Sequence, residues 1–331
     1  MDLEKRIFDA DEHNFNELAL SVFKFQYEHN KIYGQYCDLL KIKPSRVQHF
    51  TQIPFLPIQF FKTHKVTATS FEPQVVFESS GTTLSINSKH YVKDVDLYKN
   101  SFIQAFEQFY GDIGQYCILG LLPSYLEREN SSLVMMVKEL IGRSANNLSG
   151  FYLSDFKKLH NTILHNEIKG QLTLLIGVTY ALLDFAENYP MDLTHTTVME
   201  TGGMKGKREE LTRAEVHNIL QKNLGISVVH SEYGMTELLS QAYSSGNGIF
   251  NCPAWMKIVL REEHDPFAVK ASTDIINKPV TGLINIIDLC NLYSCSFIAT
   301  DDIGRLHPDG SFEVLGRMDN SDMRGCSLMA I

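Results

Sequence analysis

The stretch Val228–Ser240, VVHSEYGMTELLS, decides how this chain folds. Two β-branched residues lead into the polar loop Tyr-Gly-Met-Thr-Glu, and an apolar stretch that is compatible with a helix follows. A strand, a turn and a helix start in this order predict an α/β sheet, in which ligands bind at the carboxyl ends of the strands. Tyr233 is suited to stacking on a base, Thr236 to donating a hydrogen bond to a phosphate, and Glu237 to binding Mg²⁺. Taken alone, the same residues also fit an ordinary helix start.

Predicted strands and helices alternate along the first three quarters of the chain. The predicted strands are Gln74–Phe77, Gln115–Leu122, Leu172–Ile176, Thr194–Glu200 and Ile226–His230. The predicted helices are Phe15–His29, Ile32–Leu40, Asp94–Tyr110, Ser131–Ile141, Ser154–His165, Val178–Asn188 and one that ends at Leu220. This alternation predicts an α/β fold of βαβ units, in which mostly parallel sheets are flanked by helices.

After residue 250 the pattern changes to short β-rich pieces separated by turn signals. These pieces are Lys257–Arg261, Thr281–Asp288, Tyr293–Ala299 and Ser311–Leu315. We therefore expect residues 1–250 to form a helical amino terminus and an α/β core, and residues 251–318 to form a smaller β-rich subdomain of the same core. Residues 319–331 are expected to form a carboxyl-terminal tail.

The composition is that of a globular protein with an acidic balance. The chain has 331 residues, 44% of them hydrophobic, and 30 Lys and Arg residues against 39 Asp and Glu residues give a net charge of −9. This charge argues against nucleic acid or an anionic membrane surface as the main partner. The amino terminus lacks the apolar core of a signal peptide, and no apolar run reaches the roughly eighteen residues of a transmembrane segment, so we expect a cytoplasmic location. The six cysteines include no C-x-x-C pair, so a disulfide framework is not expected.

Four further motifs fit ligand sites, and each has an ordinary alternative. A loop rich in hydroxyl groups forms a nest suited to phosphate oxygens, although such loops are also plain turns; it consists of Ser79, Ser80, Gly81, Thr82 and Thr83. Gly202 and Gly203 allow a flat ligand to approach the backbone, or simply form a turn. Asp302, in TDDIG, and Arg317, in GRMD, are suited to ribose hydroxyls and phosphate, or else to a loop turn and a surface charge.

In their order along the chain, the motifs SSGTT, TGG, YGMTE, TDDIG and GRMD resemble the adenylate-forming superfamily of acyl-CoA synthetases, luciferase and peptide-synthetase adenylation domains. The resemblance extends from about Pro54 to the carboxyl end. It is strongest to the acyl-protein synthetase (LuxE) family, with the phenylacetate-CoA ligases as cousins. It implies the large-domain fold of these enzymes, ATP and Mg²⁺ as cofactors, and activation of a carboxylic acid as acyl-AMP.

The resemblance also implies which residues bind the nucleotide. The loop Ser79–Thr83 would bind the β- and γ-phosphates. Gly202 and Gly203 would face the adenine, and Tyr233, followed by Gly234, would stack on it.

The remaining roles that the resemblance implies concern the reacting groups. Thr236 would hold the α-phosphate, and Glu237 would bind Mg²⁺. Asp302 would bind the ribose hydroxyls, and Arg317 would bind ribose or phosphate. A family segment near the acyl pocket is similar to the region of Gly177, Tyr180 and His230.

The chain departs from the superfamily pattern at two places. Leu84 and Ser85 stand where a glycine and a nearby lysine usually follow the hydroxyl loop, which implies a less complete grip on ATP. The mobile carboxyl-terminal domain, which normally supplies a catalytic lysine and the coenzyme A channel, is expected to be absent. Cys326 resembles the acyl-accepting cysteine of LuxE-type proteins, and the alternative is a small apolar residue packed under the last loop.

The sequence therefore predicts a ligase that activates a carboxylic acid with ATP and then transfers the acyl group to Cys326 as a thioester. By resemblance, the acid is a long-chain fatty acid and the thioester is delivered to a fatty acyl reductase. One alternative is adenylation of another acid, for example an aromatic one, with transfer to coenzyme A or an acyl carrier protein. Another is a nucleotide-binding remnant without catalytic activity.

Overall fold

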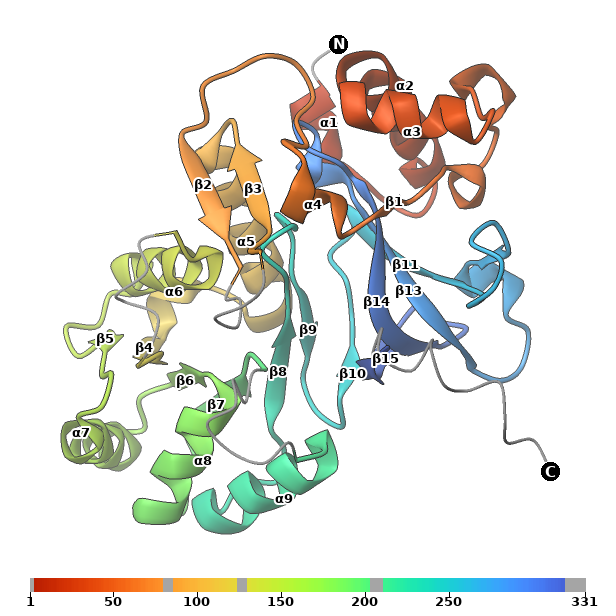
Figure 1. The fold of residues 1–331 in the computed structure, drawn as a ribbon. Coiled ribbons are helices and arrows are strands. Elements are labelled where there is room, and N and C mark those ends of the chain that lie inside the picture. Colours follow the sequence, from red (N-terminus) through yellow and green to blue (C-terminus); the bar gives the residue numbers. More distant parts are fainter. Residues whose placement is uncertain (1–2, 80–85, 124–129, 203–210, 319–331) are drawn as a thin grey trace. The chain divides into compact units, whose positions relative to one another are not determined.

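The computed structural model describes residues 3–79, 86–123, 130–202 and 211–318. Its contacts divide the chain into two units. The described parts of Phe71–Pro253 form one unit, and the described parts of Met1–Ser70 and Ala254–Ile331 form the other. Each unit contains a large sheet (Figure 1). The boundaries expected from the sequence, at residues 250 and 318, remain a prediction.

The unit of residues 71–253 is built on a six-stranded sheet with the order β5-β4-β6-β7-β8-β9. Its strands are β4 (Cys117–Leu121), β5 (Gly150–Phe151), β6 (Thr173–Gly177), β7 (Thr196–Glu200), β8 (His230–Tyr233) and β9 (Ala242–Ser244). The first five strands in this order are parallel, and β9 runs antiparallel to β8. The prediction of a mostly parallel sheet is therefore confirmed.

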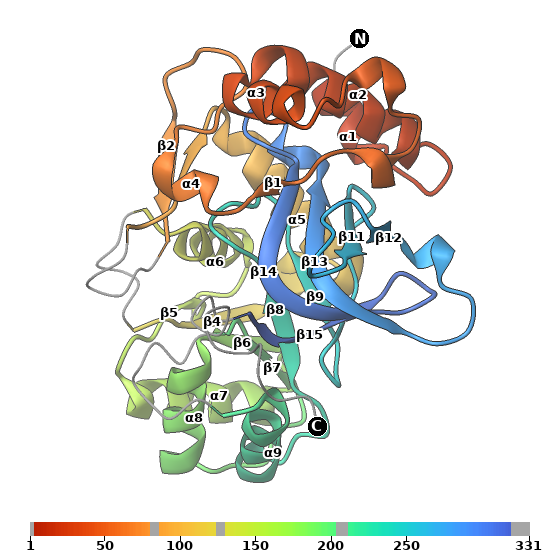
Figure 2. The same cartoon turned by 45° about the vertical axis from the view of Figure 1, so that its right-hand side comes forward.

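Helices cover both faces of this sheet. They are α5 (Val95–Tyr110), α6 (Ser132–Arg143), α7 (Phe156–Lys169), α8 (Thr179–Asn188) and α9 (Arg213–Leu224). In Figure 1 and Figure 2, α5 and α6 lie on one face, and α7, α8 and α9 lie on the other. Every residue of β4 and β6 is buried as a result, which explains their continuous apolar sequences. The unit also contains the hairpin of β2 (Val75–Glu78) and β3 (Lys89–Val92), a 3₁₀ helix at Ile113–Gln115, and β10 (Ile249–Phe250).

The chain after Tyr233 does not form the predicted helix. β8 begins at His230 rather than Ile226, and a turn and loop lead from it directly into β9, which pairs Tyr243 with Glu232. Leu238 and Leu239 in this loop are buried in the core. These apolar residues gave the sequence pattern of a helix, but they belong to a buried loop. The turn after Tyr233 therefore offers no helix amino end to a ligand.

The other unit combines a β-rich sheet with the amino-terminal helices. Its sheet has the order β15-β14-β13-β11-β12, with antiparallel neighbours, and β1 pairs parallel with β14. The strands are β1 (Leu56–Pro57), β11 (Met256–Arg261), β12 (Val269–Lys270), β13 (Val280–Asp288), β14 (Phe297–Leu306) and β15 (Phe312–Arg317). The helices are α1 (Leu3–Phe8), α2 (Phe15–His29), α3 (Lys31–Leu39) and α4 (Phe60–Thr63), with 3₁₀ helices at Pro44–Arg46, Phe50–Gln52, Ser272–Asp274 and Leu289–Asn291.

Buried polar contacts join α2 to the carboxyl-terminal strands of its unit. Gln26 is fully buried, and its Nε2 donates to the carbonyl oxygens of Asn291 and Leu292 at 2.9 and 3.0 Å. Tyr33 of α3 stacks on Phe297 of β14 with the ring centroids 6.1 Å apart. Residues 1–70 are thus held by segments more than two hundred residues further along the chain.

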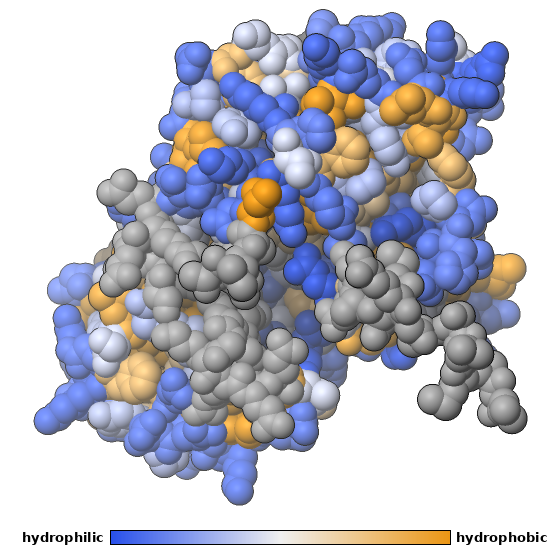
Figure 3. Space-filling view, viewed as in Figure 1, coloured by the Kyte–Doolittle hydropathy of each residue, from blue (hydrophilic) through white to orange (hydrophobic). Residues whose placement is uncertain are grey.

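The described surface is mostly polar. On the face drawn in Figure 3, hydrophobic residues lie in small groups among hydrophilic ones. The most exposed large apolar side chains come from separate elements, for example Leu39 of α3 and Ile168 of α7, as expected where each element buries one face. None of the described helices combines the length and the apolar character that crossing a bilayer requires.

Candidate active site

The loop that follows β8 lies at the carboxyl edge of the parallel sheet. β6, β7 and β8 are neighbours and end at Gly177, Glu200 and Tyr233. Side chains and loops that follow parallel strands meet at one edge, which is where α/β proteins bind their ligands. The structure therefore brings Tyr233, Gly234, Thr236 and Glu237 to the edge at which Gly202 also lies.

Thr236 is held in place by a buried histidine. His90 of β3 is 1% exposed, and its Nδ1–H donates to the carbonyl oxygen of Thr236 at 2.9 Å. Burial lowers the pKa of His90 to about 4, although the contact with Thr236 works in the opposite direction. The imidazole is therefore neutral at pH 7 and acts as a fixed hydrogen-bond donor. Glu237, the next residue, is also buried, with 6% of its surface exposed.

Tyr233 lies partly exposed at the end of β8 and packs against Phe250. The two ring centroids are 5.9 Å apart and the rings are tilted by 59°. The guanidinium of Arg213 lies over the Phe250 ring, 5.1 Å from its centroid. Tyr233 therefore belongs to a supported aromatic group, and its ring remains partly accessible from solvent.

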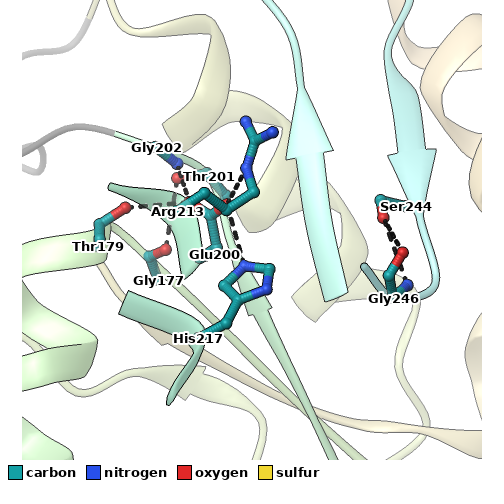
Figure 4. A network of polar contacts seen from close by, with 9 residues as sticks. All are labelled: Gly177, Thr179, Glu200, Thr201, Gly202, Arg213, His217, Ser244 and Gly246. Carbon is teal, nitrogen blue, oxygen red and sulfur yellow. Dashed lines mark hydrogen bonds and ion pairs between the residues drawn. The ribbon is translucent and has the colours of Figure 1, made fainter. Parts of the chain in front are cut away.

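Glu200 anchors the start of the Thr201-Gly202 segment (Figure 4). Its Oε2 accepts hydrogen bonds from the Thr179 hydroxyl at 3.0 Å and from the Gly202 N–H at 2.8 Å. Its Oε1 lies 3.8 Å from both Arg213 Nε and His217 Nε2. Burial alone would raise the pKa of Glu200, but the contacts with His217, Arg213 and Gly202 bring it below its ordinary value. Gly202 has a φ of 73°, in the left-handed region that favours glycine.

A cavity of about 130 Å³ lies beside the loop after β8. Gly234, Met235 and Thr236 line it on the side of the loop, and the other described residues that line it are Glu78, Tyr98, Ser131, Ser132, Leu133, Met136, Thr201, Glu232 and Gln241. The residues that the sequence assigned to an acyl pocket are not among them. Gly177 ends β6, Tyr180 is buried in α8, and His230 Nδ1 lies 3.1 Å from the hydroxyl of Tyr110, so their role remains a prediction.

The remaining two described residues of the predicted site lie in the other unit and contact each other. Asp302 of β14 stands opposite Arg317 of β15 in the strand register, and Asp302 Oδ1 lies 3.5 Å from Arg317 Nε. The TDDIG motif is therefore part of a strand, where the sequence suggested a loop. Cross-strand pairing explains why two motifs fifteen residues apart form one polar pair.

Part of the predicted site lies outside the described residues. These residues are Ser80, Gly81, Thr82, Thr83, Gly203 and Cys326. Ser79 is described: its N–H donates to the Ser88 carbonyl at 3.1 Å, and its Oγ accepts from the Ser88 N–H at 2.9 Å.

Sequence reasoning missed four buried or half-buried residues of this region. They are His90, Glu200, Glu232 and Gln241. A signal was present for two of them, because Glu200 directly precedes the Thr-Gly-Gly motif and Glu232 directly precedes Tyr233. No sequence pattern indicated His90 or Gln241, since their positions depend on how β3 and β9 pack.

Comparison with known proteins supports the same fold. Residues 5–141 match the family model described as acyl-protein synthetase, LuxE. No curated protein matches the chain in sequence. One similar structure is a 2-hydroxyisobutyryl-CoA ligase in the postadenylation state in complex with R3-HIB-AMP. It has a TM-score of 0.59 and 10% identity, over 96% of this chain and 70% of that chain.

Two further structures are similar over a smaller part of their length. An ATP-bound RpMatB-BxBclM chimera has a TM-score of 0.50 and 16% identity, over 73% of this chain and 47% of that one. A long-chain-fatty-acid-CoA ligase, FadD1, from Archaeoglobus fulgidus has a TM-score of 0.50 and 14% identity, over 73% of this chain and 51% of that one. This chain thus spans about half the length of these two proteins. The match over residues 5–141 confirms the resemblance to the acyl-protein synthetase (LuxE) family, and the chain has the fold of the adenylate-forming enzymes.

Proposed function

We propose that this protein activates a carboxylic acid with ATP at the loop after β8. A carboxylate oxygen attacks the α-phosphorus, an acyl–phosphate bond forms, the bond between the α- and β-phosphates breaks, and pyrophosphate leaves. The observation that carries the proposal is the arrangement of Thr236 and Glu237. Both follow the carboxyl end of a parallel strand, and the buried His90 fixes the backbone of Thr236 beside a cavity. Fixed donors at a reacting phosphate are a main source of catalysis in such reactions.

Comparison with the similar structures supports ATP as the second substrate. One of them contains ATP, and another contains an acyl-AMP. In our proposal, Ser79–Thr83 bind the β- and γ-phosphates, Gly202 and Gly203 face the adenine, and Tyr233 stacks on it. Asp302 and Arg317 are proposed ribose and phosphate ligands, and Gly177, Tyr180 and His230 remain candidates near the acyl group.

Glu237 is the residue proposed to hold Mg²⁺. The described part of the chain contains no group of three or more His, Cys, Asp or Glu side chains that could bind a metal. A single carboxylate still fits, because Mg²⁺ at a nucleotide is usually held by one or two carboxylates together with phosphate oxygens and water. Bound there, Mg²⁺ would neutralise phosphate charge.

The second step of the proposal is transfer of the acyl group to Cys326. The thiolate attacks the acyl carbon, a carbon–sulfur bond forms, and AMP leaves; the thiol proton passes to solvent. The resemblance to LuxE-type proteins supports this step, and it also implies a long-chain fatty acid as substrate and a fatty acyl reductase as partner. A second candidate is transfer to coenzyme A or an acyl carrier protein.

Two measurements test the two steps separately. The first is exchange of labelled pyrophosphate into ATP in the presence of Mg²⁺ and a panel of acids, which reports adenylation. The second is retention of labelled acid on the protein and its release by hydroxylamine, which reports a thioester. We expect Cys326→Ala to keep the exchange and lose the protein label. Exchange without protein label in the unaltered chain would favour the second candidate, and the absence of exchange with all acids would contradict the proposal.

A further inference from the structure

The unit that combines the amino-terminal helices with the β-rich sheet has a cavity of its own. The cavity volume is about 310 Å³, and all the described residues that line it belong to this unit. It lies where the segment Thr51–Phe55 meets β11, β13 and β14, which are neighbours in the sheet (Figure 2). None of the described residues of the predicted nucleotide and acyl site lines this cavity.

Much of the cavity wall is apolar. The apolar residues that line it include Ile53, Pro54, Phe55, Phe267, Val269 and Ala299. Phe267, in the loop between β11 and β12, is 54% exposed, although phenylalanine is usually a buried residue. An apolar ligand that lies against Phe55 and Phe267 would remove this surface from water, which favours binding.

Three polar side chains of the wall have contacts within the unit. The Tyr36 hydroxyl donates to the Phe55 carbonyl oxygen at 3.1 Å. Thr51 Oγ1 lies 2.9 Å from His49 Nδ1, and Gln52 Oε1 accepts from the His49 N–H at 3.2 Å. The fold therefore supplies contacts for each of these three side chains.

Arg261 of β11 carries the only charged side chain among the described residues that line the cavity. Its Nη1 donates to the Ile284 carbonyl oxygen at 3.2 Å and to Asn285 Oδ1 at 2.6 Å, and its Nη2 donates to the Thr300 carbonyl oxygen at 2.7 Å. A guanidinium has five N–H groups, so these bonds leave two of them without an acceptor among the described residues.

The positive charge of Arg261 has no ion-pair partner within the described part of the chain. Burial lowers the pKa of Arg261, and the negative charge of Asp301 works in the opposite direction. Both carboxylate oxygens of Asp301 accept from Gln59 Nε2, at 2.8 and 2.7 Å, so Gln59 holds this group. Since arginine stays charged in proteins and a charge removed from water is normally paired, the cavity offers a place for an anion.

Asn285 of β13 adds a second donor to the same wall. It is fully buried and lines the cavity, and its Nδ2 has no hydrogen-bond acceptor among the described residues. The bond from Arg261 to Oδ1 determines which end of the amide is the donor. Buried polar groups rarely lack a partner, so this donor indicates a place for a water or a ligand oxygen.

We propose that this cavity binds a carboxylate with an apolar body. The carboxylate accepts from the remaining N–H groups of Arg261 and from Asn285 Nδ2, and the apolar body lies against Phe55 and Phe267. A carboxylate matches the single positive charge of the wall, whereas a phosphate monoester carries about −1.5 to −2 at pH 7. The inference does not rest on the proposed adenylation, because it uses none of the residues assigned to that reaction.

The test compares three ligands of similar length in calorimetric titrations of the protein: octanoate, octanamide and octyl phosphate. We expect octanoate to bind at least about tenfold more tightly than octanamide, which has the same shape without the charge. Equal affinities for octanoate and octanamide, tighter binding of octyl phosphate than of octanoate, or no binding of octanoate would each contradict the proposal.

Substitutions in the wall assign the binding to this cavity. Asn285→Asp places a carboxylate against Arg261 and supplies the counter-ion within the fold, so we expect octanoate to bind there about tenfold or more weakly and octanamide to be unaffected. Phe267→Ala should weaken both ligands about threefold or more, because apolar contact is lost. Ile276→Ala is its control, since Ile276 is 86% exposed and is not among the residues that line the cavity. Unchanged octanoate binding in an Asn285→Asp variant that melts like the unaltered protein would overturn the proposal.

A competition experiment separates this cavity from the proposed adenylation site. Octanoyl sulfamoyl-adenosine, a stable mimic of an acyl-AMP, is added in excess before the octanoate titration. We expect the octanoate site that Asn285→Asp weakens to remain available. Loss of that site in the presence of the mimic would contradict a separate site and leave the proposed adenylation standing. Absence of pyrophosphate exchange with all acids would overturn the adenylation alone.

Discussion

Two glutamates on neighbouring strands of the same sheet have opposite surroundings. Glu200 ends β7, accepts hydrogen bonds from the Thr179 hydroxyl and the Gly202 N–H, and lies near His217 and Arg213. These contacts bring its pKa below the ordinary value despite burial. Glu232, one residue from the end of β8, has no such compensation in the described part of the chain, and its pKa is raised to about 8.

The difference separates a carboxylate that is compensated within the fold from one that is not. Glu200 uses its charge to fix Gly202 and the start of α9, so it is complete without a ligand. Glu232 lines a cavity, and burying its carboxyl group without a positive partner among the described residues costs folding free energy. The hydrogen-bond donors and positive charges around a carboxylate at a sheet edge therefore have to be compared before a role is assigned to it.

The largest effect is expected at a third carboxylate of the same edge, Glu237. Glu237→Ala should abolish pyrophosphate exchange, because the proposed Mg²⁺ ligand is lost, while thermal unfolding still reports a folded protein. Near-normal exchange in this variant would remove the Mg²⁺ assignment and leave Glu237 as a structural group like Glu200.

The next largest effect is expected at Glu200, and it concerns stability. Glu200→Gln should lower the free energy of unfolding by about 3 kcal/mol at pH 7, because the variant leaves the charged Arg213 without its carboxylate partner. Since the folded-state pKa of Glu200 is lowered, its contribution is present above pH 4.5 and is lost as the pH falls through the folded-state pKa. Urea unfolding between pH 3 and 8 measures both effects. A variant as stable as the unaltered protein at pH 7 would show that the network in Figure 4 contributes little.

Glu232→Gln should have the opposite effect on stability. A raised pKa means that the folded protein binds a proton that the unfolded chain has released, so the unaltered protein loses stability as the pH rises from about 4.5 to about 8. The variant should therefore be more stable than the unaltered protein by at least about 1 kcal/mol at pH 9, and should differ little from it at pH 5. The same urea series measures this, and a pH-independent difference would contradict the raised pKa.

The smallest effect is expected at His90. His90→Gln should reduce the exchange rate about tenfold and stability by about 1 kcal/mol, because one buried hydrogen bond to the Thr236 carbonyl is weakened or lost. The exchange assay and urea unfolding at pH 7 measure both. A normal exchange rate with reduced stability would show that His90 supports the fold and does not position Thr236.

Local patterns predicted the elements well where one segment determines its own structure. The helix Phe15–His29 has the predicted bounds, because its buried residues recur at helical spacing. The apolar strand β6 is buried along its whole length, as its sequence indicates. Among the described residues of the predicted site, Tyr233 ends β8, Gly202 closely follows β7, and Asp302 and Arg317 lie in a strand pair, so each has a local sequence signal.

Long-range contacts account for what the sequence did not predict. The loop after Tyr233 looked helical because Leu238 and Leu239 are apolar, but pairing between β8 and β9 determines its path. The raised pKa of Glu232 comes from burial and from Glu200 on another strand, and neither leaves a local signal. Likewise, Gln26 binds carbonyl groups 265 and 266 residues away, so local patterns could not group α2 with the second sheet.

The central claim is that an acyl-AMP forms at the loop after β8. A crystal structure of the protein with an acyl sulfamoyl-adenosine, a stable mimic of the acyl-AMP, tests this most directly. We predict the purine against the Tyr233 ring and the sulfamoyl group beside Thr236. A purine bound away from Tyr233, or a sulfamoyl group remote from Thr236, would contradict the account.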